Sequence, residues 1–484
     1  LLYSMKSLQN LFRTLWEKPL WLILAAAILL RLLYLALNYP LWWDSHVYLS
    51  MGKFLFSNGK MGMWEPFRPL VHPLLLGAIW KSGLNTIIIG KVLDLIFSLA
   101  SVFLVYRITE KIYSPRAAII AGMAFATAPV FIQFTGLILT EPLAILFGLL
   151  GIYFFIREKS SLKLYLSGFF LGLSFLTKFP LGILFGAAVV AILLSKNVIP
   201  EESSLRSKAT KVSIITFGFL TMVIPYLIFN YTLYHDALYP FISGSWIITT
   251  STWKYGSGWS YYLNEFFLIN PLFILIIPSL IWWARNKEWN NSYKSVNILT
   301  GILILAYFWQ LERKEVRYLV LALPFLSIII GGYLDYLYNF LVMKTKRILK
   351  PSGFWILVII LLLLPLPDGF NLDRPPTFEK EIREIVNEQN ITGTVLTSDP
   401  SFVSFLENPI ITLDGIEFAP LVYSRQKGKY SLLFVNDCDL DCPPKNNYCY
   451  NRKKELLETM NNENNIEFSS SFKECTYIIF TPKT

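Results

Sequence analysis

Acidic and basic side chains that could perform chemistry lie close to the ends of long apolar runs in this chain. The first is Asp44, which follows the predominantly apolar run Leu20–Leu37 and lies within the aromatic stretch Trp42–Leu49. A carboxylate in this place could act as a general base for a hydroxyl group at a membrane surface. It could also cap a short amphipathic helix over Ser45–Phe56, with the aromatic rings as interfacial anchors. The stretch alone favours the helix cap, because acidic N-caps are common.

Further ionisable groups occur at comparable places along the chain. They are His46, Glu65, Arg68, His72, Glu141, Lys178, His235 and the charged run 312–318. Ionisable groups at membrane depth are costly, so several that converge on one face form a candidate site. Each group also has an ordinary explanation. Lys178 could extend its ammonium group to the interface, Glu141 before Pro142 suits the first turn of a helix, and the charged run could be a solvated turn.

The composition indicates a membrane protein with several spans. Of the 484 residues, 54% are hydrophobic and 16% are charged, and the mean hydropathy is +0.48. A soluble protein would carry about a quarter charged residues. The net charge of +10 does not indicate a nucleic-acid partner, because the cytoplasmic loops of membrane proteins collect Lys and Arg. We expect no cleavable signal peptide, since no small-residue cleavage pattern follows Leu20–Leu37.

The apolar runs predict a polytopic α-helical membrane protein with about eleven transmembrane helices. These helices are expected at residues 20–38, 86–106, 117–134, 141–156, 162–177, 179–195, 212–233, 262–283, 296–311, 316–341 and 353–367. We expect Leu70–Leu84 to lie in the membrane interface, because it is apolar but short and contains Pro73.

With that choice, the loops on one side of the membrane carry more than twice as many Lys and Arg residues as the loops on the other side. The positive-inside rule then predicts a cytoplasmic N-terminus and places Asp44 on the extracytoplasmic side. The C-terminal tail follows an odd number of spans and is expected outside as well. We therefore predict a transmembrane domain at 1–367, with its first outward loop at about 39–85, and an extracytoplasmic domain at 368–484.

The tail has the pattern of a small α/β domain, because helices and strands alternate along it. Helices are expected at 377–389, 400–406 and 453–461, and strands at 393–397, 410–413, 431–435 and 476–481. Such a domain could be a lid or could recognise the acceptor. Asn390-Ile391-Thr392 within it is a short glycosylation sequon.

All four cysteines of the chain lie in this tail. They are Cys438, Cys442, Cys449 and Cys475. An even number in an extracytoplasmic domain favours two disulfides, for which three pairings exist. A zinc site is the alternative, but the spacings match no common zinc finger.

Five motifs, taken in order, resemble the GT-C superfamily of membrane glycosyltransferases. The resemblance is strongest to glycosyltransferase family 39, the protein O-mannosyltransferases and lipid A aminoarabinose transferases. The motifs are Trp43-Asp44-Ser45-His46, Arg68-Pro69-Leu70-Val71-His72-Pro73, Leu139-Thr140-Glu141-Pro142, Leu176-Thr177-Lys178-Phe179-Pro180 and Arg313-Lys314-Glu315-Val316-Arg317-Tyr318-Leu319. They fall between residues 20 and about 340, and the tail contributes no motif. Many members have a second acidic residue where this chain has Ser45, and often a Lys where it has Arg68.

The resemblance implies an inverting glycosyltransferase that moves a sugar from a polyprenyl-phosphate donor to a hydroxyl of a protein or glycolipid acceptor outside the cytoplasm. It makes Asp44 the candidate base, with Glu141 as a second catalytic candidate. The candidates for binding donor phosphate or substrate are Arg68, His72, Lys178, Arg313, Lys314, Arg317 and Tyr318. If a divalent metal takes part, Mg²⁺ or Mn²⁺ would bind Asp44 and Glu141. With all five motifs together, we favour the base over the helix cap for Asp44.

Two other classes of protein stay open. A transporter or lipid flippase would place its charges near the bilayer midplane, whereas most charges here lie at one surface. A non-catalytic homologue that only binds the carrier lipid is compatible with Ser45 in place of a second carboxylate.

Overall fold

The computed structural model describes residues 18–157, 160–194, 204–250, 255–287, 291–344, 350–370, 378–413 and 415–483. The chain divides into two compact units. The first, which we call the helical unit, comprises Leu1–Asn38, Lys91–Gly136 and Thr140–Leu372. The second, which we call the mixed unit, comprises Tyr39–Gly90, Leu137–Leu139 and Asp373–Thr484. The first outward loop is therefore grouped with the C-terminal residues, whereas the sequence had assigned it to the transmembrane domain.

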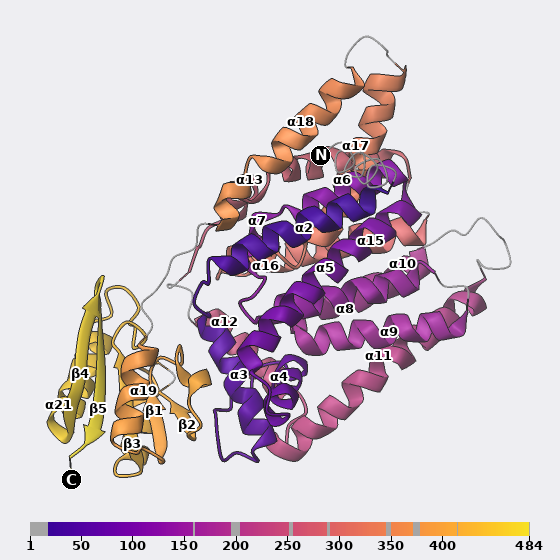
Figure 1. Ribbon diagram of the computed structural model, residues 1–484. Helices are drawn as coiled ribbons and strands as arrows, with labels where there is room; N and C mark the ends of the chain where they lie inside the picture. Colours follow the sequence, from indigo (N-terminus) through magenta and orange to yellow (C-terminus); the bar gives the residue numbers. More distant parts are fainter. Residues whose placement is uncertain are drawn as a thin grey trace, which may run out of the picture. The chain divides into compact units, whose positions relative to one another are not determined.

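The helical unit is built from apolar helices that run alongside one another (Figure 1). Its α-helices are α2 (Pro19–Ala36), α5 (Thr86–Ile112, which begins in the mixed unit), α6 (Pro115–Ala126), α7 (Pro129–Gln133), α8 (Thr140–Phe155), α9 (Ser161–Thr177), α10 (Gly182–Leu194), α11 (Leu205–Tyr234), α12 (Tyr239–Thr250), α13 (Tyr261–Ile269), α14 (Ile276–Arg285), α15 (Ser292–Gln310), α16 (Val316–Leu319), α17 (Leu323–Tyr338) and α18 (Pro351–Leu363). Short 3₁₀ or π segments are η1 (Phe179–Leu181), η4 (Pro271–Leu275), η6 (Asn339–Lys344) and η7 (Leu366–Phe370).

Five helical segments in the described part of the chain are long and apolar enough to cross a membrane. They are Pro19–Ala36, Thr86–Ile112, Leu205–Tyr234, Leu323–Val342 and Pro351–Phe370. Shorter apolar helices are Pro115–Ala126, Thr140–Phe155, Ser161–Thr177, Phe179–Leu194 and Pro271–Arg285. Each of the predicted spans contains helical residues, as expected where lipid leaves backbone groups no other hydrogen-bond partner. The protein is therefore an integral membrane protein, while the number of crossings stays a prediction.

Prolines explain why some predicted spans are divided. The run 117–134 contains two helices, because Pro129 begins α7 after α6 has ended at Ala126. The stretch Leu70–Leu84 forms α4 (Val71–Lys81), whose 11 residues are too short to cross a bilayer core of about 30 Å.

Glycines allow α9 and α11 to touch backbone to backbone. A Cβ added to Gly168 would lie 1.9 Å from the carbonyl oxygen of Ile215, and one added to Gly218 would lie 2.2 Å from that of Tyr165. Small residues at helix crossings are how apolar helices pack closely in a membrane.

The mixed unit combines α3 (Trp43–Phe56) and α4 with the C-terminal α/β domain. The C-terminal elements are α19 (Glu379–Glu388), β1 (Thr394–Thr397), η8 (Val403–Phe405), β2 (Ile410–Thr412), α20 (Ala419–Gln426), β3 (Tyr430–Asn436), α21 (Asn447–Glu463), β4 (Asn464–Phe472) and β5 (Cys475–Pro482). The strand order is β2-β1-β3-β5-β4. β1 is parallel to β2 and β3, and β5 is antiparallel to β3 and β4.

The small α/β domain predicted from the tail is present, with differences in detail. The expected helix at 400–406 is only the 3₁₀ turn η8, and both α20 and β4 were missed. β4 lies at the edge of the sheet and is largely exposed, with a run of serines in place of alternating apolar residues. A strand that buries little apolar surface leaves no alternation for a sequence pattern to detect.

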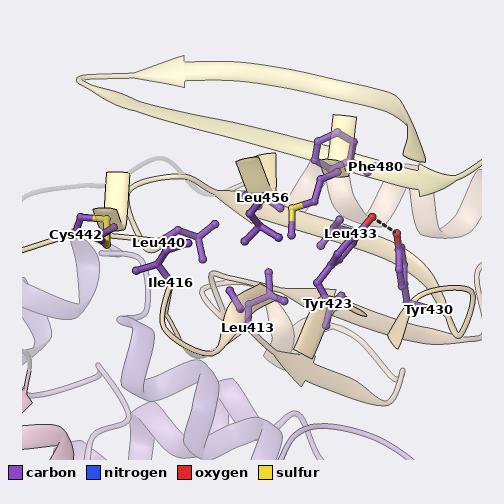
Figure 2. Close-up of a cluster of buried hydrophobic side chains, with 14 residues drawn as sticks. Leu413, Ile416, Tyr423, Tyr430, Leu433, Leu440, Cys442, Leu456 and Phe480 are labelled. Carbon is purple, nitrogen blue, oxygen red and sulfur yellow. Dashed lines mark hydrogen bonds between the residues drawn. A yellow bond between two sulfur atoms is a disulfide. The ribbon is translucent and has the colours of Figure 1, made fainter. Parts of the chain in front are cut away.

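The core of this domain lies between one face of the sheet and the helices α20 and α21 (Figure 2). Leu433 from β3, Phe480 from β5 and Leu456 from α21 are buried together in it. The hydroxyl of Tyr430 donates to that of Tyr423 at 3.4 Å within the same cluster. Burial of these side chains, rather than strand length, holds the sheet to its helices.

The four cysteines form the two predicted disulfides. Cys438 pairs with Cys475, which links the end of β3 to the start of β5. Cys442 pairs with Cys449, which ties the loop after β3 to the first turn of α21. This selects one of the three pairings that the sequence left open.

Candidate functional site

Asp44 lies in the first turn of α3 and is not its N-cap. The N-cap residue is Trp42, and α3 begins at Trp43. The helix-cap explanation for Asp44 is therefore wrong in its geometry, although an acidic group in a first turn still interacts favourably with the helix dipole.

Arg68 joins the side chains around Asp44 into one cluster, which we call the Asp44 cluster. Its Nη1 donates to Asp44 Oδ1 at 2.7 Å and its Nε donates to Glu65 Oε2 at 2.7 Å. Nη1 also lies 3.3 Å from the hydroxyl of Tyr48. All three ionised side chains are at most 15% exposed. Burial alone would lower the pKa of Arg68, but the carboxylates of Asp44 and Glu65 outweigh this and raise it above its ordinary value.

The Asp44 cluster contains a second carboxylate, Glu65, to which the sequence had assigned no specific role. The motif resemblance suggested an acid directly after Asp44, where this chain has Ser45. Ser45 instead donates its hydroxyl to the carbonyl oxygen of Leu137. The second acid, Glu65, is held beside Arg68, so two carboxylates share one guanidinium group.

Two glycines bring α3 and α4 together and so place Tyr48 beside His72. A Cβ on Gly52 would lie 2.7 Å from the backbone nitrogen of Gly77, and a Cβ on Gly77 would lie 2.6 Å from the carbonyl oxygen of Gly52. The buried ring of His72 meets that of Tyr48 edge-on, with centroids 5.5 Å apart. His72 is thus joined to the Asp44 cluster through Tyr48.

The other two histidines lie elsewhere. His46 is buried against Ser404 and Phe405 of the C-terminal domain. Burial lowers the pKa of His46 to about 3, so its imidazole is neutral at ordinary pH. His235 ends α11 in a left-handed conformation, with φ of 57°.

Glu141 and Lys178 form a buried ion pair in the helical unit. Lys178 Nζ lies 2.5 Å from Glu141 Oε1, and the side chain of Glu141 is only 2% exposed. Glu141 stands in the first turn of α8, where Thr140 Oγ1 also donates to Glu141 Oε2 at 3.2 Å. Lys178 follows the last residue of α9 with an extended backbone, since Pro180 lacks the N–H that would continue the helix.

A third group of charges, the Glu315 cluster, lies at the start of α16. Arg313 Nη2 lies 2.6 Å from Glu315 Oε1, and Arg317 Nε lies 2.5 Å from Glu315 Oε2. Tyr318 donates its hydroxyl to Glu315 Oε1 at 2.8 Å. Burial would raise the pKa of Glu315, but Arg317 and Arg313 outweigh it and lower the pKa. One carboxylate between two guanidinium groups leaves an excess of one positive charge.

Lys314, between Arg313 and Glu315, binds backbone carbonyls at the end of α15. Its Nζ donates to the carbonyl oxygens of Trp309 at 2.7 Å and Leu311 at 2.5 Å. These carbonyls lie at the C-terminal end of α15, where a cation is favoured. The backbone nitrogen of Lys314 also donates to Gly256 at 2.9 Å, which fixes the loop before α16.

The two predicted metal ligands each have a cationic partner. Arg68 pairs with Asp44, and Lys178 pairs with Glu141. Within the part of the chain that the structure describes, no three His, Cys, Asp or Glu side chains gather as ligands. Because both carboxylates are already paired with cations, we derive no step through a metal.

Comparisons with known proteins were made for the sequence and for the fold. Residues 68–229 match the family model described as dolichyl-phosphate-mannose-protein mannosyltransferase. The fold matches that of ArnT from Cupriavidus metallidurans bound to undecaprenyl phosphate, with a TM-score of 0.61 and 14% identity. This match covers 95% of the present chain and 97% of ArnT. The chain has the GT-C fold.

A second solved structure of the GT-C fold agrees. The oligosaccharyltransferase AglB from Archaeoglobus fulgidus, in complex with an inhibitory peptide and a dolichol-phosphate, matches with a TM-score of 0.58 and 11% identity. This match covers 96% of the present chain and 74% of AglB. No curated protein sequence matches the chain.

The GT-C fold confirms the resemblance drawn from the motifs and extends it. The family model covers the motifs around Arg68, Glu141 and Lys178 but neither Asp44 nor the Glu315 cluster. The tail contributes no sequence motif, yet the match to ArnT covers nearly the whole chain and so reaches into the tail. Short motifs report only local stretches of sequence. A structural match at 14% identity reports the arrangement of the helices and strands over most of the chain.

Proposed function

We propose that this protein is an inverting glycosyltransferase that transfers a sugar from a polyprenyl-phosphate carrier to an acceptor hydroxyl on the extracytoplasmic side of the membrane. The observation that carries the proposal is the Asp44 cluster, in which Arg68 holds a carboxylate in the first turn of α3 within a GT-C fold. Two proteins of this fold were solved with a polyprenyl phosphate bound. A fold by itself does not give a function, so the argument rests on the clusters.

In the proposed reaction, Asp44 is the general base. The acceptor oxygen forms a bond to the anomeric carbon of the sugar while the bond from that carbon to the carrier phosphate breaks. The acceptor proton passes to the Asp44 carboxylate, and the polyprenyl phosphate leaves with the bonding electrons. A single displacement of this kind inverts the anomeric centre. The task of Arg68 is then to hold Asp44 and Glu65 in place, because its Nε and Nη1 donate to those two carboxylates.

We assign the donor phosphate to the Glu315 cluster. A leaving phosphate needs cationic donors, and guanidinium groups can bind its oxygens in pairs. Arg313 and Arg317 carry two positive charges and Glu315 carries one negative charge, so the cluster has a net charge of one positive unit. The cluster can therefore bind an anion while Glu315 stays paired with the guanidinium groups. Lys178, being neutralised by Glu141, is assigned to holding Glu141 in place, where Glu141 can orient the acceptor.

The proposed side of the membrane rests on two observations. The loops that carry fewer Lys and Arg residues are those predicted to lie outside. The C-terminal domain contains two disulfides, which persist in oxidising compartments and are rare in the cytosol.

The test is sugar transfer by the purified protein from polyprenyl-phosphate-linked mannose and from a panel of other polyprenyl-phosphate-linked hexoses and pentoses. Wild type is compared with Asp44→Asn, each with and without EDTA. We expect Asp44→Asn to lower turnover by roughly 100-fold or more, as for loss of a general base. Asp236→Asn is the matched control, since Asp236 lies outside the clusters and an Asn side chain can still accept from the backbone of Leu238.

Turnover that survives in Asp44→Asn would remove the base assignment while keeping the transferase class. Absence of turnover with every donor, together with carrier-lipid binding that Asp44→Asn leaves unchanged, would favour a non-catalytic lipid-binding protein. EDTA-sensitive turnover would contradict the metal-free scheme.

A further inference from the structure

The helix that carries Asp44 is held along its length by one segment of the C-terminal domain. This segment, residues 404–410, meets the chain of α3 and its following loop at three successive points: His46, Lys53 and Gly62. All of these residues belong to the mixed unit. The segment includes the end of η8 and the start of β2, so it is fixed in turn by the sheet.

The first point of contact lies two residues from Asp44. His46 Nδ1 is 2.7 Å from the hydroxyl oxygen of Ser404, and the His46 ring meets that of Phe405 edge-on at 5.5 Å. Both His46 and Ser404 are buried. A hydrogen bond between buried polar groups is costly to leave unmade, so it fixes the first turn of α3.

The second point lies two turns further along α3. Lys53 is only 6% exposed, and its Nζ donates to the carbonyl oxygen of Leu406 at 2.8 Å and to Glu407 Oε1 at 2.6 Å. A buried ammonium group is tolerated only where a partner neutralises it. Glu407 therefore determines where this face of α3 lies.

The third point extends the sheet. Gly62 donates its backbone N–H to Asn408 at 2.8 Å and accepts from that of Ile410 at 2.9 Å, in a parallel bridge beside β2. Gly62 has φ of 78°, and a Cβ there would lie 2.2 Å from the carbonyl oxygen of Ser50 in α3. Only glycine can make both contacts, so the loop is held between the sheet edge and α3.

We propose that the C-terminal domain is a positioning element for the general base, with Ser404 and Glu407 holding α3 so that Asp44 stays against Arg68. This inference rests on the proposed function and deepens it. It differs from a lid or an acceptor-recognition domain, which would act mainly on acceptor binding. Displacing a catalytic group by about 1 Å can cost roughly 100-fold in rate, so small shifts of α3 suffice.

The experiment uses the full-length protein carrying Glu407→Gln, and a second variant with Ser404→Ala added. Glu407→Gln keeps the shape of a side chain that is 55% exposed. Its amide oxygen can still accept from Lys53 Nζ, which also keeps its bond to the carbonyl oxygen of Leu406, so we expect the variant to fold. Glu458→Gln is the matched control, since Glu458 pairs with Lys454 on the exposed surface of α21. The readouts are kcat, the acceptor KM, the pH profile of kcat/KM, and hydrogen exchange of the α3 amides.

We expect Glu407→Gln to lower kcat and the double variant to lower it by roughly 10-fold or more, with the acceptor KM little changed. Hydrogen exchange over α3 should become faster, and the acid limb of the pH profile should move, because loss of contact with Arg68 changes the surroundings of Asp44. The Glu458→Gln control should match wild type in all four readouts.

Failure of this inference is distinguishable from failure of the proposed function. Loss of turnover in Asp44→Asn, combined with unchanged kcat and α3 exchange in the double variant, would overturn the positioning role alone. A raised acceptor KM with unchanged kcat would replace it with acceptor recognition. If wild type itself transfers no sugar, the proposed function fails. Hydrogen exchange of the α3 amides still tests the anchoring separately, because an unchanged exchange rate in the double variant would show that Ser404 and Glu407 do not hold the helix.

Discussion

Lys178 Nζ lies 2.5 Å from Glu141 Oε1, which joins two residues to which the sequence had assigned separate roles. Glu141 comes from the first turn of α8, and Lys178 from the end of α9. Removing either partner of such a buried pair would destabilise the protein, because the remaining charge would be left uncompensated.

We predict that Lys178→Met and Glu141→Gln each destabilise the protein more than the double variant does. Breaking a buried ion pair from one side costs about 3–5 kcal/mol, whereas removing both partners is often close to neutral. The free energy of unfolding of each variant, measured in detergent by heating or by adding denaturant, tests this prediction. Lys380→Met is the control, since the Lys380–Glu384 pair is exposed and worth about 0–1 kcal/mol. Equal losses from the single and double variants would contradict the pairing.

Replacement of Arg68 should act on kcat rather than on donor binding. Arg68→Lys keeps the charge but replaces two separated guanidinium nitrogens, which donate to Asp44 and Glu65, with a single ammonium nitrogen on a flexible stem. The two carboxylates lose their fixed spacing, so we expect kcat to fall roughly 10-fold or more. Steady-state kinetics with varied donor and acceptor measure this, with Arg206→Lys on the exposed start of α11 as control. A raised donor KM at unchanged kcat would instead make Arg68 a phosphate ligand.

Arg313 and Arg317 should be needed for binding the donor. A hydrogen bond to a charged group contributes about 1.5–3 kcal/mol, so Arg317→Gln should raise the donor KM by roughly 10-fold or more. The loss should shrink as salt concentration increases, because salt screens the attraction. Arg285→Gln, on an exposed side chain at the end of α14, serves as control. An unchanged donor KM in both Arg313→Gln and Arg317→Gln would remove the assignment.

His46 should make the stability of the mixed unit depend on pH. Burial lowers the pKa of His46 from 6.5 to about 3 in the folded protein. Below about pH 6.5 the imidazole of His46 therefore binds a proton in the unfolded chain but not in the folded chain. The free energy of unfolding consequently falls as the pH drops from 6.5 towards 3. Unfolding midpoints at pH 7.5 and pH 5 should differ more for wild type than for His46→Gln. His235→Gln, which changes an exposed imidazole, should keep the wild-type difference. A wild-type pH dependence in His46→Gln would show that other groups cause it.

The sequence alone determined much of the architecture. Long apolar runs predict helices because a backbone in lipid has no partner for its hydrogen bonds except itself, and each run proved helical. Alternating helix and strand patterns predicted the small α/β domain. The order of five motifs was enough to indicate the GT-C superfamily, and four cysteines in one tail indicated two disulfides.

Only the tertiary structure decided which groups meet. Arg68 lies 24 residues from Asp44 and Lys178 lies 37 residues from Glu141, and no local pattern relates such positions. The structure also shows that Lys314, a phosphate candidate from the sequence, donates its ammonium N–H groups to carbonyl oxygens at the end of α15. A charged residue in the sequence indicates that its side chain needs a partner if it is buried. The sequence does not indicate which residue will be that partner.

The same limit applies to the grouping of the first outward loop with the C-terminal residues. Sequence order assigned Tyr39–Gly90 to the transmembrane part, yet the contacts of His46, Lys53 and Gly62 join it to the tail. Those contacts span more than 340 residues of chain. Propensity and periodicity act over a few turns or strands, whereas the position of a base depends on packing that forms only when distant segments come together.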